Sequence, residues 1–167
     1  MMLFETERFL IRRFTDKDEL TFYLFNSNPI IMQFIRPVKT REDCAIFLQE
    51  NLNMYQSDDV VGRYLVVEKK TDLPVGTFSF LKLNDEVNYH IGYGMFPEYW
   101  RKGIAQELVK HGTEFFFDST NFESLFAITN KEHDVSKHVL SKSGFLLKRN
   151  FIEGGKELDL FEIQKHK

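Results

Sequence analysis

The sequence predicts an α+β fold in which helix layers cover both faces of one mixed, mostly antiparallel sheet of about seven strands, with about four helices in all. Two observations predict this arrangement. Short runs rich in β-branched and aromatic residues alternate with longer stretches of helical periodicity along the chain. One strand, at 89–96, is followed at once by an amphipathic helix and a further strand, which is the order of a right-handed crossover between parallel strands.

The N-terminal part of the chain predicts one strand and two helices. The run RFLIRRF at 8–14 alternates well enough for a strand. Thr15 and Thr40 each precede an aspartate by three residues, as in a capping box, and therefore predict helix starts. The helix after Thr40 is expected to end near Gln56. The segment 26–39 has turn signals but many apolar residues, so it is expected to form a short second helix or a lip over a pocket.

The rest of the chain predicts a meander, the crossover and a final hairpin. Strands are expected at 63–69, 75–83, 89–96, 124–129, 145–152 and 157–164, and a helix at 135–143 that ends at a C′ glycine. The first three strands form an antiparallel meander, with its first turn expected at 71–74, and the last two flank the hairpin signal EGGK. Gly92 and Gly94 interrupt their strand and predict a bulge or a close backbone approach.

The composition fits one globular domain, expected over 1–167, and excludes several classes of protein. The 18 phenylalanines indicate a core built on aromatic packing. A net charge of −3 argues against a general nucleic-acid binder. A single cysteine, Cys44, excludes an internal disulfide and fits a reducing, cytoplasmic compartment. We expect no signal peptide, no membrane span and no metal, because neither long apolar runs nor metal-ligand spacings occur.

A cationic turn joins the strand at 89–96 to the long helix. Arg101 and Lys102 precede Gly103, and the helix begins after it. A helix start leaves about four backbone N–H groups without partners and carries roughly half a positive charge. With no Cβ on Gly103, a ligand could approach the backbone closely, so the turn predicts a phosphate or pyrophosphate site at the C-terminal end of the strand. The alternative is a strand–helix turn with a solvated cationic cap.

Several motifs are similar to those of one enzyme family. Residues 100–105, WRKGIA, resemble an acetyl-CoA loop of the form Q/R-x-x-G-x-G/A, with Trp in the first place. TERFLIRRFTDKD near the start, SKHVLSKSGF and the closing EGGKELDLFEI resemble further segments of the same family. Over nearly its whole length the chain thus resembles the GCN5-related N-acetyltransferases (GNAT), most closely the RimJ- and RimL-like branch that acetylates N-terminal amines of ribosomal proteins. The resemblance implies acetyl-CoA as co-substrate.

The resemblance assigns residues to the co-substrate by position. The backbone N–H groups that would hold the CoA pyrophosphate are those of Arg101, Lys102, Gly103, Ile104 and Ala105. The strand edge at Met95 and Phe96 would pair with the pantetheine amides and offer a backbone N–H to the thioester oxygen. Further side chains that would face CoA are Asn130, Ser136 and Lys142, although His133 stands where the family often has Asn.

Acyl transfer to an amine needs the amine deprotonated, and the resemblance implies direct transfer without a protein nucleophile. His90 stands where many relatives have a Glu, and an imidazole with a reference pKa near ~6.5 suits base work at neutral pH. A hydrogen-bonded sheet histidine without a chemical role is the alternative. Leu140 occupies the place of the usual Tyr acid, so Ser141 or a water would protonate the thiolate, unless Ser141 is a solvated helix residue.

We therefore predict an N-acetyltransferase that moves an acetyl group from acetyl-CoA to a primary amine in a ternary complex. The acceptor would be selected by the lip at 28–39, the second helix and the final hairpin. Phe34 and Arg36 are candidate pocket residues, unless Phe34 packs in the core and Arg36 is solvated. A peptide N-terminus and a small hydrophobic amine both fit. The protein is expected to be a monomer or homodimer that binds neither nucleic acid nor membrane. The alternative is a catalytically silent acyl-CoA-binding or protein-interaction module on the same fold.

Overall fold

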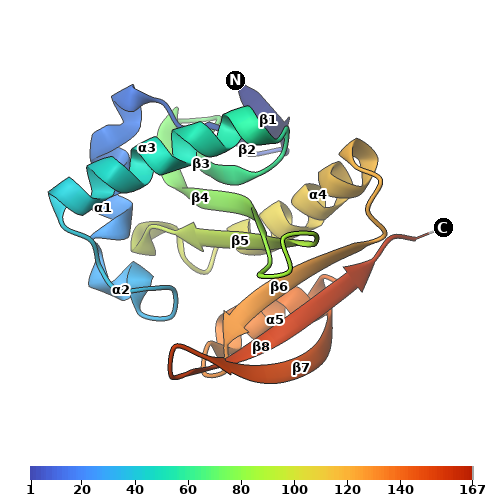
Figure 1. The fold of residues 1–167 in the computed structure, drawn as a ribbon. Helices are drawn as coiled ribbons and strands as arrows, with labels where there is room; N and C mark the ends of the chain where they lie inside the picture. Colours follow the sequence, from blue (N-terminus) through green and yellow to red (C-terminus); the bar gives the residue numbers. More distant parts are fainter. Residues whose placement is uncertain (167) are drawn as a thin grey trace.

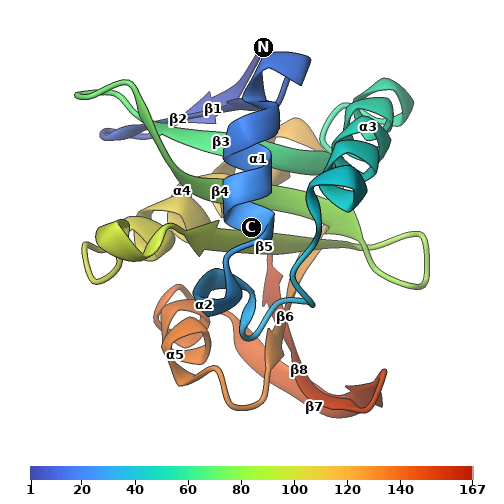
Figure 2. The ribbon, with the colours of Figure 1, turned by 90° about the vertical axis from the view of Figure 1, so that its left-hand side faces the viewer.

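The computed structural model describes residues 1–166, which form one eight-stranded sheet with helices on both faces (Figures 1 and 2). Across the sheet the strand order is β1-β2-β3-β4-β5-β6-β8-β7. Among these described neighbours the pair β5 and β6 is parallel and all the others are antiparallel. The predicted fold class is confirmed, with one strand more than the sequence indicated.

The elements follow the predicted order. The strands are β1 (Met2–Glu5), β2 (Phe9–Arg13), β3 (Gly62–Glu68), β4 (Leu73–Lys82), β5 (Tyr89–Met95), β6 (Ser124–Asn130), β7 (Leu146–Glu153) and β8 (Lys156–Gln164). The helices are α1 (Glu19–Asn26), α2 (Pro29–Met32), α3 (Arg41–Ser57), α4 (Ile104–Ser119) and α5 (Asp134–Lys142), with short 3-10 turns at Asp16–Asp18 and Pro97–Tyr99. The meander of β3, β4 and β5 and the hairpin of β7 and β8 are both confirmed.

Two local features differ from the sequence prediction. β1, whose run MLFE is too short to give a periodic signal, pairs with β2 at the edge of the sheet. The turn expected at 71–74 ends earlier, because β4 begins at Leu73 and contains Pro74. Pro74 pairs with Val67 at a register shift of the β3–β4 ladder, and an irregular place in a ladder tolerates a residue without an N–H.

The helix starts follow the predicted capping residues. Thr15 forms a capping box with Asp18 at the 3-10 turn that leads into α1. Thr40 Oγ1 accepts a hydrogen bond from the N–H of Asp43 at 3.1 Å, and α3 begins at the next residue after Thr40. α2, capped by Asn28, is the short helix expected between 26 and 39.

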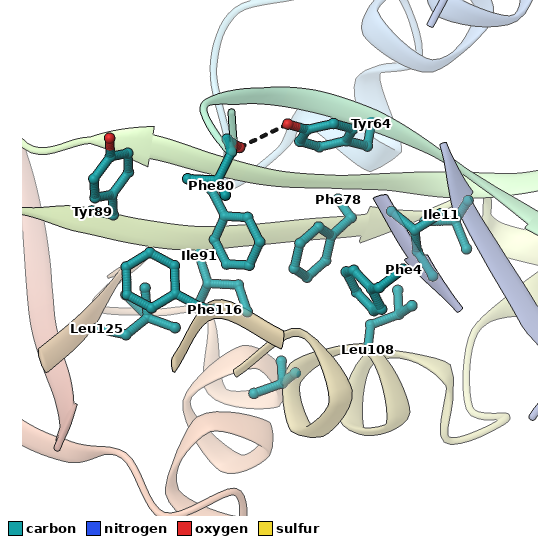
Figure 3. Close-up of a cluster of buried hydrophobic side chains, with 14 of the residues drawn as sticks. Phe4, Ile11, Tyr64, Phe78, Phe80, Tyr89, Ile91, Leu108, Phe116 and Leu125 are labelled. Atoms are coloured by element: carbon teal, nitrogen blue, oxygen red, sulfur yellow. Dashed lines mark hydrogen bonds between the residues drawn. The ribbon is translucent and has the colours of Figure 1, made fainter. Parts of the chain in front are cut away.

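The main core lies between the sheet and α4 and is built largely from aromatic rings (Figure 3). Phe78 lies 4.9 Å from Phe80 and 5.2 Å from Phe4, in edge-on geometry. Phe80 in turn packs on Phe116 of α4, with 5.3 Å between the ring centroids. The buried hydroxyl of Tyr64 donates to a backbone carbonyl at 2.7 Å, so its polar atom is satisfied. The expected aromatic core is confirmed.

The opposite face of the sheet is covered by α1 and α3, and Figure 2 shows α1 lying across β3, β4 and β5. Successive side chains of a strand point to opposite faces. Tyr64 and Val66 of β3 therefore belong to the main core, whereas Leu65 and Val67 pack with Leu48 of α3 in a second cluster.

β5 and β6 separate soon after they meet. The parallel ladder between them consists of the pairs His90–Phe126 and Ile91–Ala127. Beyond these pairs β6 continues to pair with β8, and β5 with β4, over the rest of their lengths. Figure 1 shows the resulting divergence, with β6, β8 and β7 turning away below β5. The edge of β5 beyond Ile91 is therefore left without a strand partner on that side.

The expected bulge at the glycines of β5 is wrong, because the β4–β5 register runs without a shift over the whole of β5. The expected close approach is present, but side chains make it. A Cβ on Gly92 would lie 2.5 Å from Ser79 Oγ, and a Cβ on Gly94 would lie 2.9 Å from Phe25 Cζ. Both glycines therefore leave space for neighbouring side chains of this protein.

Gly112 of α4 gives a direct test of how tightly the main core is packed. A Cβ at this position would lie 2.5 Å from Phe78 Cζ, so we expect Gly112→Ala to lower the free energy of unfolding by about 1–3 kcal/mol. Chemical denaturation measures this change. The same substitution in a Phe78→Leu background should cost less, since the ring is gone. An increase in stability of about 1 kcal/mol, the usual helix effect of alanine, would contradict the packing.

Candidate active site

The turn before α4 exposes a row of backbone N–H groups. Gly103 is the N-cap of α4 in a left-handed conformation, with φ of 72°, and no side chain caps the helix. In the described part of the chain, none of the N–H groups of residues 101–105 donates a hydrogen bond. A Cβ on Gly103 would meet only Arg8 Nη2, at 3.9 Å. The turn therefore offers unpaired donors and open space, which fits a phosphate or pyrophosphate.

A hydrogen-bond network anchors this turn to the start of the chain. Arg8 Nη1 donates to the carbonyl of Lys102 at 3.1 Å, and Arg8 Nε donates to Glu107 Oε1 at 2.8 Å. Thr6 Oγ1 donates to Glu107 Oε2 at 2.6 Å. Although partial burial opposes ionisation, the hydrogen bonds from Thr6 and Arg8 lower the pKa of Glu107. The carboxylate thus holds Arg8 beside the turn.

A cavity of about 950 Å³ opens where β5 and β6 diverge. Its wall includes residues 90–93 of β5 and residues 127–130 of β6. Among the predicted site residues, those that line it are Phe34, Arg36, His90, Asn130 and Ser136. His133 and Leu140, at the positions where the family usually has other residues, line it as well. The structure thus brings the candidate base, two CoA-facing candidates and both acceptor candidates to one cavity.

Other predicted residues lie elsewhere. Residues 101–105 form the turn described above, outside the cavity wall. Ser141 and Lys142 are exposed on α5 and do not line the cavity, so the structure gives Ser141 no contact with the reacting groups. Met95 is buried, and Phe96 packs edge-on against Phe25 with 5.7 Å between the ring centroids.

The backbone of Phe96 is not available to the co-substrate, because its N–H donates to the carbonyl of Val75 at 2.9 Å. The N–H and C=O of one strand residue point to the same side, and the side alternates along the strand. The groups that face the open edge of β5 are therefore those of Met95 and Tyr93. The Met95 carbonyl already accepts a hydrogen bond from the Trp100 indole at 2.8 Å. Phe96 therefore does not face the open edge as expected, whereas Tyr93 does.

His90 lies in the cavity as a neutral imidazole. Burial, with the nearby Arg63 guanidinium adding to it, lowers the pKa of His90 to about 4, and Glu153 opposes this shift only in part. Among residues 1–166 the His90 ring has no hydrogen-bond partner, and it lines the cavity. A neutral ring with a free nitrogen can accept a proton or a hydrogen bond from an amine.

Tyr93 is a functional candidate that the sequence analysis missed. Its hydroxyl lies 2.9 Å from Ser136 Oγ, and both residues line the cavity. Burial raises the pKa of Tyr93 to about 12, which keeps the phenol protonated at neutral pH. Leu140 stands at the helix position where the family usually has an acid, and the structure places a phenol from the strand in the same cavity. The serine beside this phenol is Ser136, not Ser141. The signal was the aromatic residue directly after Gly92.

Further residues of the cavity wall are aromatic or cationic. Phe34 stacks on His133, with 4.7 Å between the ring centroids and an interplanar angle of 18°. Burial lowers the pKa of His133, so this pair forms a flat, largely uncharged wall. Arg63, which the sequence showed only as the start of a strand, lines the cavity beside Arg36.

The described residues show neither a metal centre nor a membrane-spanning helix. No group of at least 3 His, Cys, Asp or Glu side chains in residues 1–166 could hold a metal ion. None of the helices in that part of the chain has both the length and the apolar character needed to cross a bilayer.

The fold combines a turn of unpaired N–H groups before α4 with a cavity lined by His90 and Tyr93, an arrangement that fits the class of acyl-CoA-dependent transferases. A family model of the acetyltransferase (GNAT) domain matches residues 8–146. The uncharacterized N-acetyltransferase YnaD of Bacillus subtilis (strain 168) is 31% identical over 140 residues, which cover 83% of this chain and 79% of that protein.

Solved structures share the fold. The acetyltransferase (GNAT family) from Bacillus anthracis matches with a TM-score of 0.84 at 26% identity, over 98% of both chains. RimL, a ribosomal L7/L12 alpha-N-protein acetyltransferase in complex with coenzyme A, gives 0.82 at 14% identity, over 98% of both chains. The spermidine N-acetyltransferase from Vibrio cholerae, in complex with CoA and spermine, gives 0.78 at 18% identity, over 95% of this chain and 96% of that chain.

The chain therefore belongs to the GNAT family of acetyltransferases. It is an acetyl-CoA-dependent N-acetyltransferase, and both the predicted family and the predicted co-substrate are confirmed. The residues around the turn before α4 fit that co-substrate, since their N–H groups are unpaired and Gly103 leaves the approach open.

The pKa of His90 predicts a loss of stability in acid. The unfolded chain takes up a proton on His90 near pH 6.5, whereas the folded protein does so only near pH 4. The contribution of neutral His90 to the free energy of unfolding is therefore fully present above pH 6.5. It is lost as the pH drops from 6.5 towards 4, by up to about 2 kcal/mol. In His90→Gln this part of the fall should be absent. Denaturant unfolding at pH 7.5 and pH 4.5 measures it in both proteins.

The matched control for this measurement is His138→Gln, since His138 is exposed on α5 and does not line the cavity. We expect this variant to keep the pH dependence of the parent protein. If His90→Gln and His138→Gln lose the same stability between the two pH values as the parent, His90 is not buried as a neutral ring.

Proposed function

We propose that the protein transfers the acetyl group of acetyl-CoA directly to a primary amine while both substrates are bound. The observation that carries the proposal is the position of the cavity: it lies at the open edge of β5 and is lined by both His90 and the Tyr93–Ser136 pair. The acceptors named for two structural neighbours, a ribosomal protein N-terminus and spermidine, are both primary amines. These two proteins support a primary amine as the class of acceptor, but they do not identify the particular amine.

The chain's own residues suggest how each proton moves. The amine must lose a proton before its lone pair can attack the thioester carbon. His90, neutral and free of a hydrogen-bond partner in the described chain, accepts this proton directly or through a water. Its pKa of about 4 makes it a weak base, so its environment must change when the acceptor binds.

As the C–N bond forms, the C–S bond breaks and sulfur leaves as a thiolate, while the nitrogen releases its remaining extra proton, which neutralises the thiolate by way of Tyr93 or a water. Tyr93 donates a hydrogen bond or its proton to that sulfur, while Ser136 orients the phenol from 2.9 Å. A thiol of reference pKa around ~8.5 needs only a modest donor. The backbone of Tyr93 and Met95, at the open edge of β5, would pair with the pantetheine arm and the thioester oxygen.

Replacing Gly103 tests the phosphate site proposed at the turn before α4. We expect Gly103→Leu to abolish measurable CoA binding in isothermal titration calorimetry, because the side chain enters the space before the unpaired N–H groups. The matched control is Gly155→Leu, at a left-handed glycine with φ of 77° and open surroundings in the β7–β8 turn. Both variants carry a similar backbone strain of about 1–2 kcal/mol, so a loss of binding in both would show that strain alone is responsible.

Tyr93→Phe tests the donor to sulfur. We expect kcat to fall by about 100-fold, a usual effect of a lost general acid, while CoA affinity stays the same. Thiol release from acetyl-CoA across a panel of amines and peptides gives both the rate and the acceptor. Unchanged kcat removes Tyr93 from the mechanism. Tight CoA binding with no thiol release on any amine would instead favour the silent module.

A further inference from the structure

Two arginines at one end of the cavity have no anionic partner. Arg36, after α2, and Arg63, in β3, both line the cavity. Both guanidinium groups stack on the ring of Phe47 from α3, at 5.0 Å and 4.4 Å from its centroid. In the described chain neither forms an ion pair with a carboxylate. Other arginines do so: Arg12, for example, lies 2.8 Å from Asp18.

The missing partner is visible at the level of single atoms. Arg36 Nη2 donates to the neutral Asn26 Oδ1 at 2.5 Å, but Arg36 Nε and Arg63 Nη1 are buried and have no hydrogen-bond acceptor in the described chain. Burial, together with the neighbouring charge of Arg36, lowers the pKa of Arg63 to about 10. A buried charge without a partner destabilises the folded protein, so an acceptor supplied from outside would relieve an existing cost.

Asn51 fixes the backbone of Arg63 through two hydrogen bonds. Asn51 Oδ1 accepts from the Arg63 N–H at 2.8 Å, and Asn51 Nδ2 donates to the Arg63 carbonyl at 3.0 Å. The register places Arg63 beside Ser79, and Ser79 beside Gly92. Side chains of directly paired residues point to the same face, so the small Ser79 and Gly92 leave a path from Arg63 towards the splayed edge of β5. His90 lies on the same face, two residues from Gly92.

The rest of the cavity wall does not cancel this charge. Its other cationic residues are Lys82, Arg149 and Lys156, and its carboxylates are Asp85 and Glu153. Glu153 is engaged, since its Oε1 accepts from Asn84 Nδ2 at 2.7 Å, and Asp85 accepts from the N–H groups of its own turn. The cavity is therefore cationic in a protein whose net charge is −3.

We infer that the acceptor is a primary amine that also carries a carboxylate, which Arg63 and Arg36 bind while the amino group lies beside His90. This inference rests on the proposed function and names its substrate class. Guanidinium groups match the planar geometry of a carboxylate. Polycationic amines are poor acceptors in this view, because their charges would face the two arginines. Free amino acids and peptides with an acidic residue near the N-terminus both have the required chemistry.

The carboxylate also acts on the base. The charge of Arg63 is one of the causes that depress the pKa of His90, and an anion on Arg63 offsets that charge. His90 therefore becomes a better proton acceptor when an acceptor of the right class is bound, which supplies the change of environment that its low pKa requires.

Matched acceptors test the inference. We would measure thiol release from acetyl-CoA with leucine against leucinamide, with the dipeptide Leu-Asp against Leu-Asn, and with phosphoethanolamine and spermidine. Each kcat/KM is expressed per unprotonated amine. We expect the carboxylate member of at least one matched pair to exceed its amide by about 10–100-fold, the usual effect of one charged hydrogen-bonded contact. The leucine and Leu-Asp arms separate a free amino acid from an acidic peptide.

Arg63→Met tests the residue itself. We expect kcat/KM for the preferred carboxylate acceptor to fall by about 100-fold, while kcat/KM for its amide does not fall, because loss of the Arg63 charge removes one cause of the low pKa of His90. Thermal stability should be retained, since an unpaired buried charge is removed. The control is Arg41→Met, because Arg41 also stacks on a ring, that of Tyr23, but does not line the cavity. This control should behave as the parent protein, and Arg63→Lys should retain part of the preference.

The outcomes separate the two levels of the proposal. Equal rates for carboxylates, amides and spermidine would overturn the carboxylate inference and leave the acetyltransfer to amines standing. A clear preference for phosphoethanolamine would overturn the choice of carboxylate as the anion. An equal loss for acid and amide acceptors in Arg63→Met would show that Arg63 does not read the anion. No thiol release with any amine would overturn the proposed function itself.

Discussion

The divergence of β5 and β6 is the constraint on which the rest of the site depends. Each strand is fully paired on its outer side, β5 with β4 and β6 with β8, while the ladder between them is limited to His90–Phe126 and Ile91–Ala127. Backbone groups that lose a ladder partner need another one. Here they border a cavity, so an extended ligand with its own amides can take the place of the missing strand. The same divergence leaves room for the Tyr93 hydroxyl to reach Ser136.

The turn at residues 101–103, before α4, has a strained backbone that neighbouring residues hold in place. Arg101 and Gly103 both have positive φ, of 63° and 72°, and a left-handed residue other than glycine costs about 1–2 kcal/mol. The Trp100 indole bonded to the Met95 carbonyl fixes the chain before this turn, and Arg8 bonded to the Lys102 carbonyl fixes it within. Glu107 completes the support from the first turn of α4. The turn can therefore present unpaired N–H groups without collapsing onto them.

Most of the fold could be predicted from the sequence because its signals are local. Capping residues at Thr15 and Thr40, the glycine before α4 and the EGGK hairpin each act within a few residues of themselves. β1 was not predicted because its four residues show too little periodicity. The bulge was wrongly expected because a glycine in a strand can also serve to leave space for a neighbouring side chain. The turn before α4 is likewise a local motif, and a phosphate site there was expected from the residues alone.

The rest of the candidate site depends on contacts between distant segments. Tyr93 became a candidate because its hydroxyl lies beside Ser136. Arg63 became a candidate because its guanidinium has a buried nitrogen without a hydrogen-bond partner. No spacing in one sequence predicts that a guanidinium will lack a carboxylate, since this follows from the packing of β3, α3 and the segment after α2. Natural proteins retain a destabilising feature, such as a buried guanidinium without a carboxylate, at functional sites. In the proposed mechanism, an acceptor that supplies the missing anion would both stabilise the complex and strengthen His90 as a base, so the acceptor would be selected in the chemical step as well as in binding.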